Sequence, residues 1–152
     1  MHTPEQAEEL SVFRGMSEAE IDELRSLCAT RWVQEGQTVL RQDEGSRSFY
    51  CLLSGGVEVL RDAGLGPRSI AIIKAGECFG EIGFFAGEDR TASIRAVDES
   101  ELLVINQADL DRMSERSPRL LARLLHNILT MVSIRFADVT TRMASMVFWL
   151  GS

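Results

Sequence analysis

The residue types that could do chemistry are concentrated between Gly76 and Ala96. Here the run Gly80-Glu81-Ile82-Gly83 is followed, nine positions after the glutamate, by Arg90. The glycines let the backbone approach a ligand closely, and a short helix that starts near Glu81 would offer free N–H groups to an anion. Arg90 adds a charged fork that matches phosphate oxygens, whereas an ionised Glu81 is an acceptor that suits a sugar hydroxyl. This combination predicts a pocket for a ribose phosphate.

The rest of the chain offers little for metal or acid–base chemistry. The two histidines have no second His or Cys at ligand spacing, so we expect no metal site. The three cysteines are far apart, which predicts buried, reduced thiols rather than a disulfide or metal site: Cys28, Cys51 and Cys78. No nucleophile–base pair accompanies Glu81, which should stay ionised beside Arg90. We therefore expect no enzyme, no catalytic residue and no cofactor.

Composition and charge narrow the class of protein. The chain has 152 residues, of which 45% are hydrophobic and 26% charged, and this predicts one globular domain. Of the net charge of −7, residues 1–24 carry most, with seven acidic residues against one arginine. The remainder is nearly balanced, so we expect no basic stripe and no direct DNA binding. The longest apolar run is about five residues and the N-terminus is polar, which predicts a cytoplasmic protein without a membrane span or secretory signal.

The distribution of glycine divides the chain into three parts. Ten of the twelve glycines fall within residues 36–87. Before them, Ser17 and Glu20 form a capping-box pattern for a helix that should end near Thr30. The glycine-rich part reads as short strands: Arg31–Val33, Thr38–Arg41, Ser48–Leu53, Val57–Arg61, Ser69–Ile73, a strand within 90–96, and Leu102–Ile105. This spacing favours an antiparallel barrel, roll or sandwich.

The C-terminal part should be helical again. Asn106 and Asp109 can cap a short helix that ends near Met113, and Ser117-Pro118 starts a second helix of about thirty residues. This long helix carries an apolar stripe: Leu121, Leu125, Ile128, Val132, Phe136, Val139, Met143, Met146 and Leu150. The stripe is longer than a small barrel can cover, so we expect part of it to pair with another chain, as in a homodimer. The alternative is a helix that folds back entirely onto its own domain.

The motif order resembles the phosphate-binding cassette of the cyclic nucleotide-binding domain family. The resemblance rests on Phe79-Gly80-Glu81-Ile82-Gly83, then Arg90-Thr91-Ala92 and Ile94-Arg95-Ala96. It extends over residues 11–150, with Phe13 to Ser17 like the entry helix and Ser48 to Val59 like the central hairpin. It implies an α+β fold: an antiparallel β-roll of the double-stranded β-helix or jelly-roll type, with a short N-terminal and a long C-terminal helix. We expect a single domain over 1–152: helical to residue 30, a roll over 31–105 with the cassette at 76–96, and helices over 106–150.

The resemblance also implies roles for individual residues and a ligand, cAMP or cGMP. Glu81 would accept the ribose 2′-hydroxyl, and Arg90 would pair with the cyclic phosphate. Backbone N–H groups around Gly80, Ile82, Thr91 and Ala92 would complete the phosphate cradle, beside Gly83. The purine would lie against the roll and under the long helix, on Val59, Ile70, Phe79, Arg135 and Phe136. The implied function is a non-catalytic sensor in which the C-terminal helix closes over the base and signals to a regulated protein.

Several alternatives remain open at this stage. Glu81 and Arg90 could pair with each other in a member that has lost its ligand and serves as a dimerisation scaffold. Arg135 could be a solvated charge. A hydroxyl residue at Thr91 suits either base, and we lean to cAMP. Asp43-Glu44 stands where the family more often has Gly-Asp, so this turn should differ. No helix-turn-helix follows the long helix before Ser152, which leaves a stand-alone sensor or one piece of a longer protein.

Overall fold

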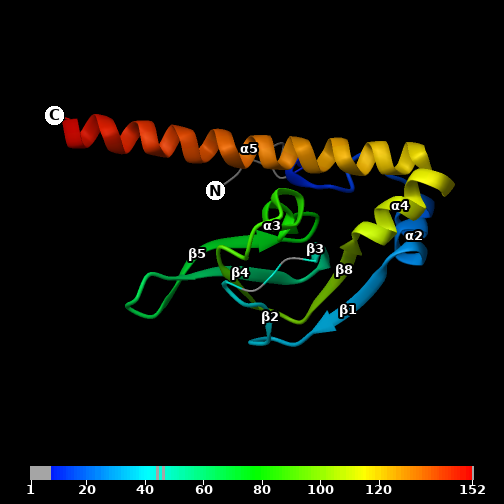
Figure 1. Cartoon of the computed structure of the whole chain (residues 1–152), viewed down its shortest axis with the longest axis horizontal. Coiled ribbons are helices and arrows are strands. Elements are labelled where there is room, and N and C mark those ends of the chain that lie inside the picture. Colours follow the sequence, from blue (N-terminus) through cyan, green and yellow to red (C-terminus); the bar gives the residue numbers. More distant parts are fainter. Residues whose placement is uncertain (1–7, 44, 46, 152) are drawn as a thin grey trace.

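The computed structural model describes residues 8–43, 45 and 47–151, and it places a β-roll alongside one long helix (Figure 1). The helices are α2 (Glu18–Leu27), α3 (Glu81–Ala86), α4 (Gln107–Arg116) and α5 (Pro118–Gly151). The strands are β1 (Ala29–Val33), β2 (Thr38–Leu40), β3 (Ser48–Ser54), β4 (Gly56–Asp62), β5 (Pro67–Lys74), β6 (Cys78–Phe79), β7 (Ser93–Ala96) and β8 (Ser100–Asn106).

The strands form two four-stranded sheets, in the orders β1-β8-β3-β6 and β2-β7-β4-β5. Every pairing is antiparallel. Together with the short N-terminal helix and the long C-terminal helix, this confirms the predicted α+β fold with an antiparallel β-roll.

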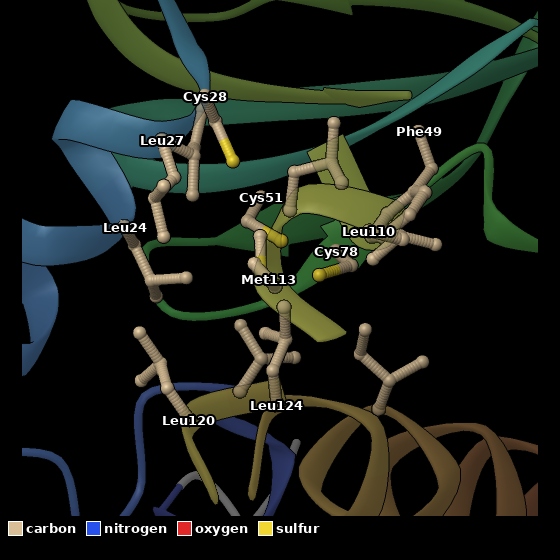
Figure 2. Close-up of a cluster of buried hydrophobic side chains, with 14 of the residues drawn as sticks. Leu24, Leu27, Cys28, Phe49, Cys51, Cys78, Leu110, Met113, Leu120 and Leu124 are labelled. Carbon is tan, nitrogen blue, oxygen red and sulfur yellow. The ribbon is translucent and has the colours of Figure 1, made fainter. Parts of the chain in front are cut away.

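Strand β3 is buried on both faces, and this explains its continuous apolar sequence. Its side chains alternate between two cores, as the period of a strand requires. Phe49 and Cys51 join a cluster beneath α2, α4 and α5 (Figure 2), whereas Tyr50 and Leu52 join a cluster between the two sheets. Strands β8 and β6 also contribute to both clusters, so the sheet that contains β3 joins the roll to its helical cover.

Both predicted capping patterns are present in full. The capping boxes of Ser17 with Glu20 and of Asn106 with Asp109 both form. Helix α2 ends at Leu27 rather than near Thr30, because Ala29 already pairs with Val104 of β8. Asp43 takes a positive φ of 68°, a conformation that glycine adopts most readily and that aspartate tolerates better than most other residues. Glu44 lies outside the described residues.

Helix α5 divides into a packed half and an exposed half. The apolar side chains that it buries are Leu120, Leu124, Ile128 and Met131. The buried face is centred about one position before the predicted stripe, and one position in a helix is a rotation of about 100°. Ile128 belongs to both the buried face and the predicted stripe. Along the helix, the predicted stripe becomes exposed, from 37% at Leu125 to 72% at Phe136 and 84% at Leu150. The alternative of a helix folded back entirely onto its own domain is therefore wrong.

By length and composition alone, α5 could also cross a membrane, which the short apolar runs did not indicate. One such helix is weak evidence, because the core helices of soluble proteins pass the same test. The first half of α5 packs on the cluster that contains Phe49 and Cys51.

The three cysteines lie within the described residues and can be compared with the prediction. Cys28, Cys51 and Cys78 are buried and free, as predicted. Among the described residues, no group of three or more potential metal ligands is found. His2 lies outside those residues.

Candidate functional site

A cavity of about 180 Å³ lies where the cassette, the roll and α5 meet. Ten of the twelve residues predicted for the site line it: Val59, Phe79, Gly80, Glu81, Ile82, Gly83, Arg90, Thr91, Ala92 and Arg135. Three lining residues were not predicted: Leu40, Ile73 and Ile94. All three are apolar residues whose side chains point from a strand into the roll. The alternation of inward and outward side chains along each strand is the signal that could have predicted them.

Two predicted residues lie outside this cavity. Ile70 is 58% exposed, whereas Ile73 of the same strand is buried. Val59 pairs with Ala71 and Leu60 with Ser69, so the register between β4 and β5 shifts at Ile70. Phe136 is 72% exposed and follows Arg135 by one position, which is a rotation of about 100° around α5. In this structure neither side chain lines the cavity, and their contact with a base stays a prediction.

Arg90 is held in place by backbone carbonyls. Its side chain is only 6% exposed, and its two Nη atoms donate to the carbonyl of Gly80 at 2.8 Å and to that of Ser48 at 2.6 Å. Gly80 has a φ of 77°, and a Cβ added there would lie 2.5 Å from an Nη atom of Arg90. The glycine is therefore required both by its own conformation and by the position of the guanidinium group.

Glu81 pairs with Arg135 of α5 across 54 residues of sequence. The carboxylate Oε1 of Glu81 lies 3.1 Å from Nη1 of Arg135, and the other Nη of Arg135 lies 3.1 Å from Glu77. The Arg135 side chain is 29% exposed and that of Glu81 only 6%. Arg135 is therefore not a solvated charge; it ties α5 to the cassette.

Burial changes the acid–base character of Glu81. Desolvation raises the pKa of its carboxyl group, and Arg135, its own backbone N–H and Arg90 only partly oppose this effect. The direction of this shift shows that removal of the carboxylate from water outweighs the attraction of the two arginines.

The first turn of α3 supplies further donors. Its N-cap is Gly80, and no side chain caps the helix in the described structure. The first backbone bond of the turn runs from the N–H of Phe84 to the carbonyl of Gly80, so the N–H groups of the preceding residues have no partner within the helix. A fixed guanidinium, free N–H groups and one buried carboxylate can bind an anion and an adjacent hydroxyl group.

Comparison with known proteins places this arrangement in a family. The family model of the cyclic nucleotide-binding domain matches residues 30–117. The cyclic AMP receptor protein of Thermus thermophilus is 28% identical over 128 residues, which are 84% of this chain and 57% of that protein. The chain thus spans little more than half of that relative's length.

Solved structures agree with the fold. The Thermus thermophilus catabolite activator protein superposes with a TM-score of 0.75 and 28% identity, over 90% of this chain and 63% of that one. A c-di-GMP responsive global regulator of Xanthomonas campestris superposes with a TM-score of 0.74 and 24% identity, over 88% of this chain and 66% of that one; this likeness concerns the fold alone. With the family model matched over more than half of its residues, the chain belongs to the cyclic nucleotide-binding domain family.

Proposed function

We propose that residues 1–152 act as one non-catalytic sensor domain for a cyclic mononucleotide. The observation that carries the proposal is the placement of Arg90 and Glu81, both buried, on one cavity at the first turn of α3. Arg90 and the backbone N–H groups around Gly80 and Ile82 bind the cyclic phosphate, with Thr91 and Ala92 at its edge. Glu81 accepts the ribose hydroxyl. A cavity of about 180 Å³ suits a mononucleotide better than a dinucleotide.

The base lies against the apolar side of the cavity in this proposal. Val59, Ile73 and Phe79 supply that surface, and Leu40 and Ile94 extend it. An apolar wall without a specific acceptor or donor binds either purine through its faces. Thr91 is the polar group that could favour guanine, and we retain the preference for cAMP.

Occupancy is reported by α5. Arg135 already contacts the carboxylate that the ribose needs, so a bound nucleotide changes the partner of Arg135 and thereby the seating of the helix. A ligand shifts such an equilibrium only by its difference in affinity between the two states. In this proposal the exposed half of α5 pairs with a second copy of the chain. The protein is cytoplasmic, and the dimer signals to a regulated protein rather than to DNA.

One observation favours the alternative of a scaffold whose pocket binds no ligand. Glu81 and Arg90 both have partners within the protein: Arg135 for the carboxylate and two carbonyls for the guanidinium. A vestigial pocket would keep these contacts for stability alone. Titration separates the two functions, because the scaffold gives a stable oligomer that is indifferent to nucleotide.

The test is a calorimetric titration of the purified chain with cAMP, cGMP and c-di-GMP, after denaturing extraction to detect any co-purified ligand. We expect micromolar or tighter binding of a cyclic mononucleotide and recovery of the nucleotide unchanged. Arg90→Ala should weaken binding by about 2–5 kcal/mol, because the phosphate loses its charged partner. The matched control is Arg95→Ala, since Arg95 is an exposed arginine that pairs with Glu58 outside the cavity.

Because Arg90 is buried, the thermal midpoint of each variant is measured alongside binding. Glu81→Gln serves as a second variant that keeps the shape of the side chain. Absence of binding to all three nucleotides, with none in the extract, or normal binding by a folded Arg90→Ala variant, would refute the proposal.

A further inference from the structure

A second hollow lies on the other side of α5, away from the cassette. It has a volume of about 700 Å³ and runs between the N-terminal segment, at Arg14 and Gly15, and the first half of α5, at Arg119, Arg123 and His126. Figure 1 shows the N-terminal segment beside α5. None of the residues that line the nucleotide cavity line this hollow.

The wall of this groove is built by specific hydrogen bonds. The amide of Asn127, which is 7% exposed, donates to the carbonyls of Val12 at 2.8 Å and of Arg14 at 2.9 Å. Arg123 donates to the carbonyl of Gly15 at 2.7 Å. These bonds fix the N-terminal segment against α5, so the groove is a defined feature of the fold rather than a gap beside a loose terminus.

The charge of the groove contrasts with that of the chain. Three arginines line it against one acid, Glu9, in a protein whose net charge is −7. Among the described residues, neither Arg14 nor Arg119 has a partner for its guanidinium group. The near balance of charge after residue 24 concealed this surface, because its arginines come from two segments more than a hundred residues apart in sequence.

The groove continues into an apolar stretch. An adjoining hollow of about 460 Å³ shares Glu9, His126 and Thr130 and extends along α5 to Leu129, Ile134 and Ala137. From residue 119 to residue 137, α5 rises by about 27 Å, which is the length of about eight residues of extended chain. The surface therefore has a basic end and an apolar end at the spacing of a short peptide.

We propose that this groove binds an extended acidic segment of a partner protein, with carboxylates at the arginine end and apolar side chains at the Leu129 end. Guanidinium groups pair with carboxylates in bidentate geometry. Glu9 and the acidic net charge oppose every anion, but they oppose the dense, continuous charge of a nucleic acid more than the few carboxylates of a short peptide. A small phosphate would also leave most of so open a groove unfilled. The proposal is independent of the nucleotide site.

The test is selection of a displayed library of random octapeptides on the full chain, followed by fluorescence anisotropy with the selected peptides. We expect the selected peptides to contain two or more acidic residues followed by apolar ones. We also expect these peptides to compete with one another for the groove. The double substitution Arg14→Gln with Arg119→Gln should weaken binding at least tenfold and leave the thermal midpoint unchanged, since neither side chain has a partner. Arg68→Gln, on exposed β5, is the matched control and should bind as the wild type does.

Three outcomes would overturn the proposal. One is a selection without an acidic consensus. Another is acidic peptides whose affinity is the same in the double variant. The last is inorganic phosphate or duplex DNA that competes at lower concentration than the peptides and with the same dependence on Arg14 and Arg119, which would make the groove a phosphate site. Arg90→Ala should leave peptide binding intact, so failure of the nucleotide proposal is distinguishable from failure of this one.

Discussion

Arg135 in the middle of α5 and Glu81 at the start of α3 form an ion pair with a separation of 3.1 Å. This contact joins the long helix directly to the cassette, and Glu77 holds the same guanidinium from the other side. The residue that the proposed function assigns to the ribose is thus also the residue that positions α5.

Removal of this link should uncouple the helix from the site. In the wild type, we expect nucleotide binding to change the hydrogen exchange of α5 around residues 132–138. In Arg135→Gln this change should be lost, while nucleotide affinity falls less than in Arg90→Ala, because the phosphate contacts remain. Hydrogen-exchange mass spectrometry with and without cAMP measures this. Arg142→Gln, on the exposed half of α5, is the control, and an unaltered exchange response in Arg135→Gln would contradict the coupling.

The raised pKa of Glu81 predicts a particular dependence on pH. Because the folded state holds this proton more tightly than the unfolded state, the contribution of Glu81 to stability is greatest below its ordinary value of 4.5 and is lost as pH rises through the raised pKa. The free energy of unfolding of the wild type, relative to Glu81→Gln, should therefore fall over this window. A relative stability that instead rises with pH would show a lowered pKa. Chemical denaturation at several pH values measures it.

Nucleotide binding should show the opposite trend across the same pH window. The ionised carboxylate is the better hydroxyl acceptor, so affinity should weaken as pH falls and Glu81 becomes protonated. In Glu81→Gln, which carries no titratable group at this position, the affinity should be lower at neutral pH and should vary less over the window. Calorimetric titrations at matched ionic strength provide the comparison, and an identical pH profile for both proteins would remove Glu81 from the ribose contact.

Gly80→Ala separates backbone strain from displacement of Arg90. The alanine would have to keep the left-handed backbone conformation of Gly80, which costs about 1–2 kcal/mol of stability. Its Cβ would also press on the Arg90 guanidinium. Gly87→Ala is the matched control, because Gly87 has a φ of 72° but nothing within 4 Å of an added Cβ. Both variants should lose similar stability on denaturation, whereas only Gly80→Ala should also lose nucleotide affinity. Equal affinities in the two variants would mean that Arg90 can shift without consequence.

The packed face of α5 can be tested with two leucines. Leu124 is fully buried, so Leu124→Ala should lower the free energy of unfolding by about 2–5 kcal/mol. Leu129 is 64% exposed on the neighbouring face. Leu129→Ala should therefore change the free energy of unfolding of the monomer by less than about 0.5 kcal/mol. The order of the two effects in urea denaturation reports which face of the helix packs on the roll.

The cassette could be predicted from the sequence because its chemistry is local. Gly80, Glu81, Gly83 and Arg90 fall within eleven residues of sequence, and the structure gathers them on one cavity. Contacts between distant segments could not be predicted in the same way. The link from Arg135 to Glu77 depends on how α5 is rotated, and the sequence carries two adjacent apolar stripes that differ by one position. The sequence predicts Ile70 rather than Ile73 for the cavity, because the residue types in β5 do not indicate that its register with β4 shifts.

The division of α5 also has a mechanical consequence. From Arg135 to Leu150 the helix extends about 22 Å beyond its last contact with the cassette. A tilt of about 10° at Arg135 moves the far end by about 4 Å, roughly the width of a side chain. A change of partner at one carboxylate is thereby amplified along a rigid lever, and the exposed apolar residues at its tip sweep the greatest distance.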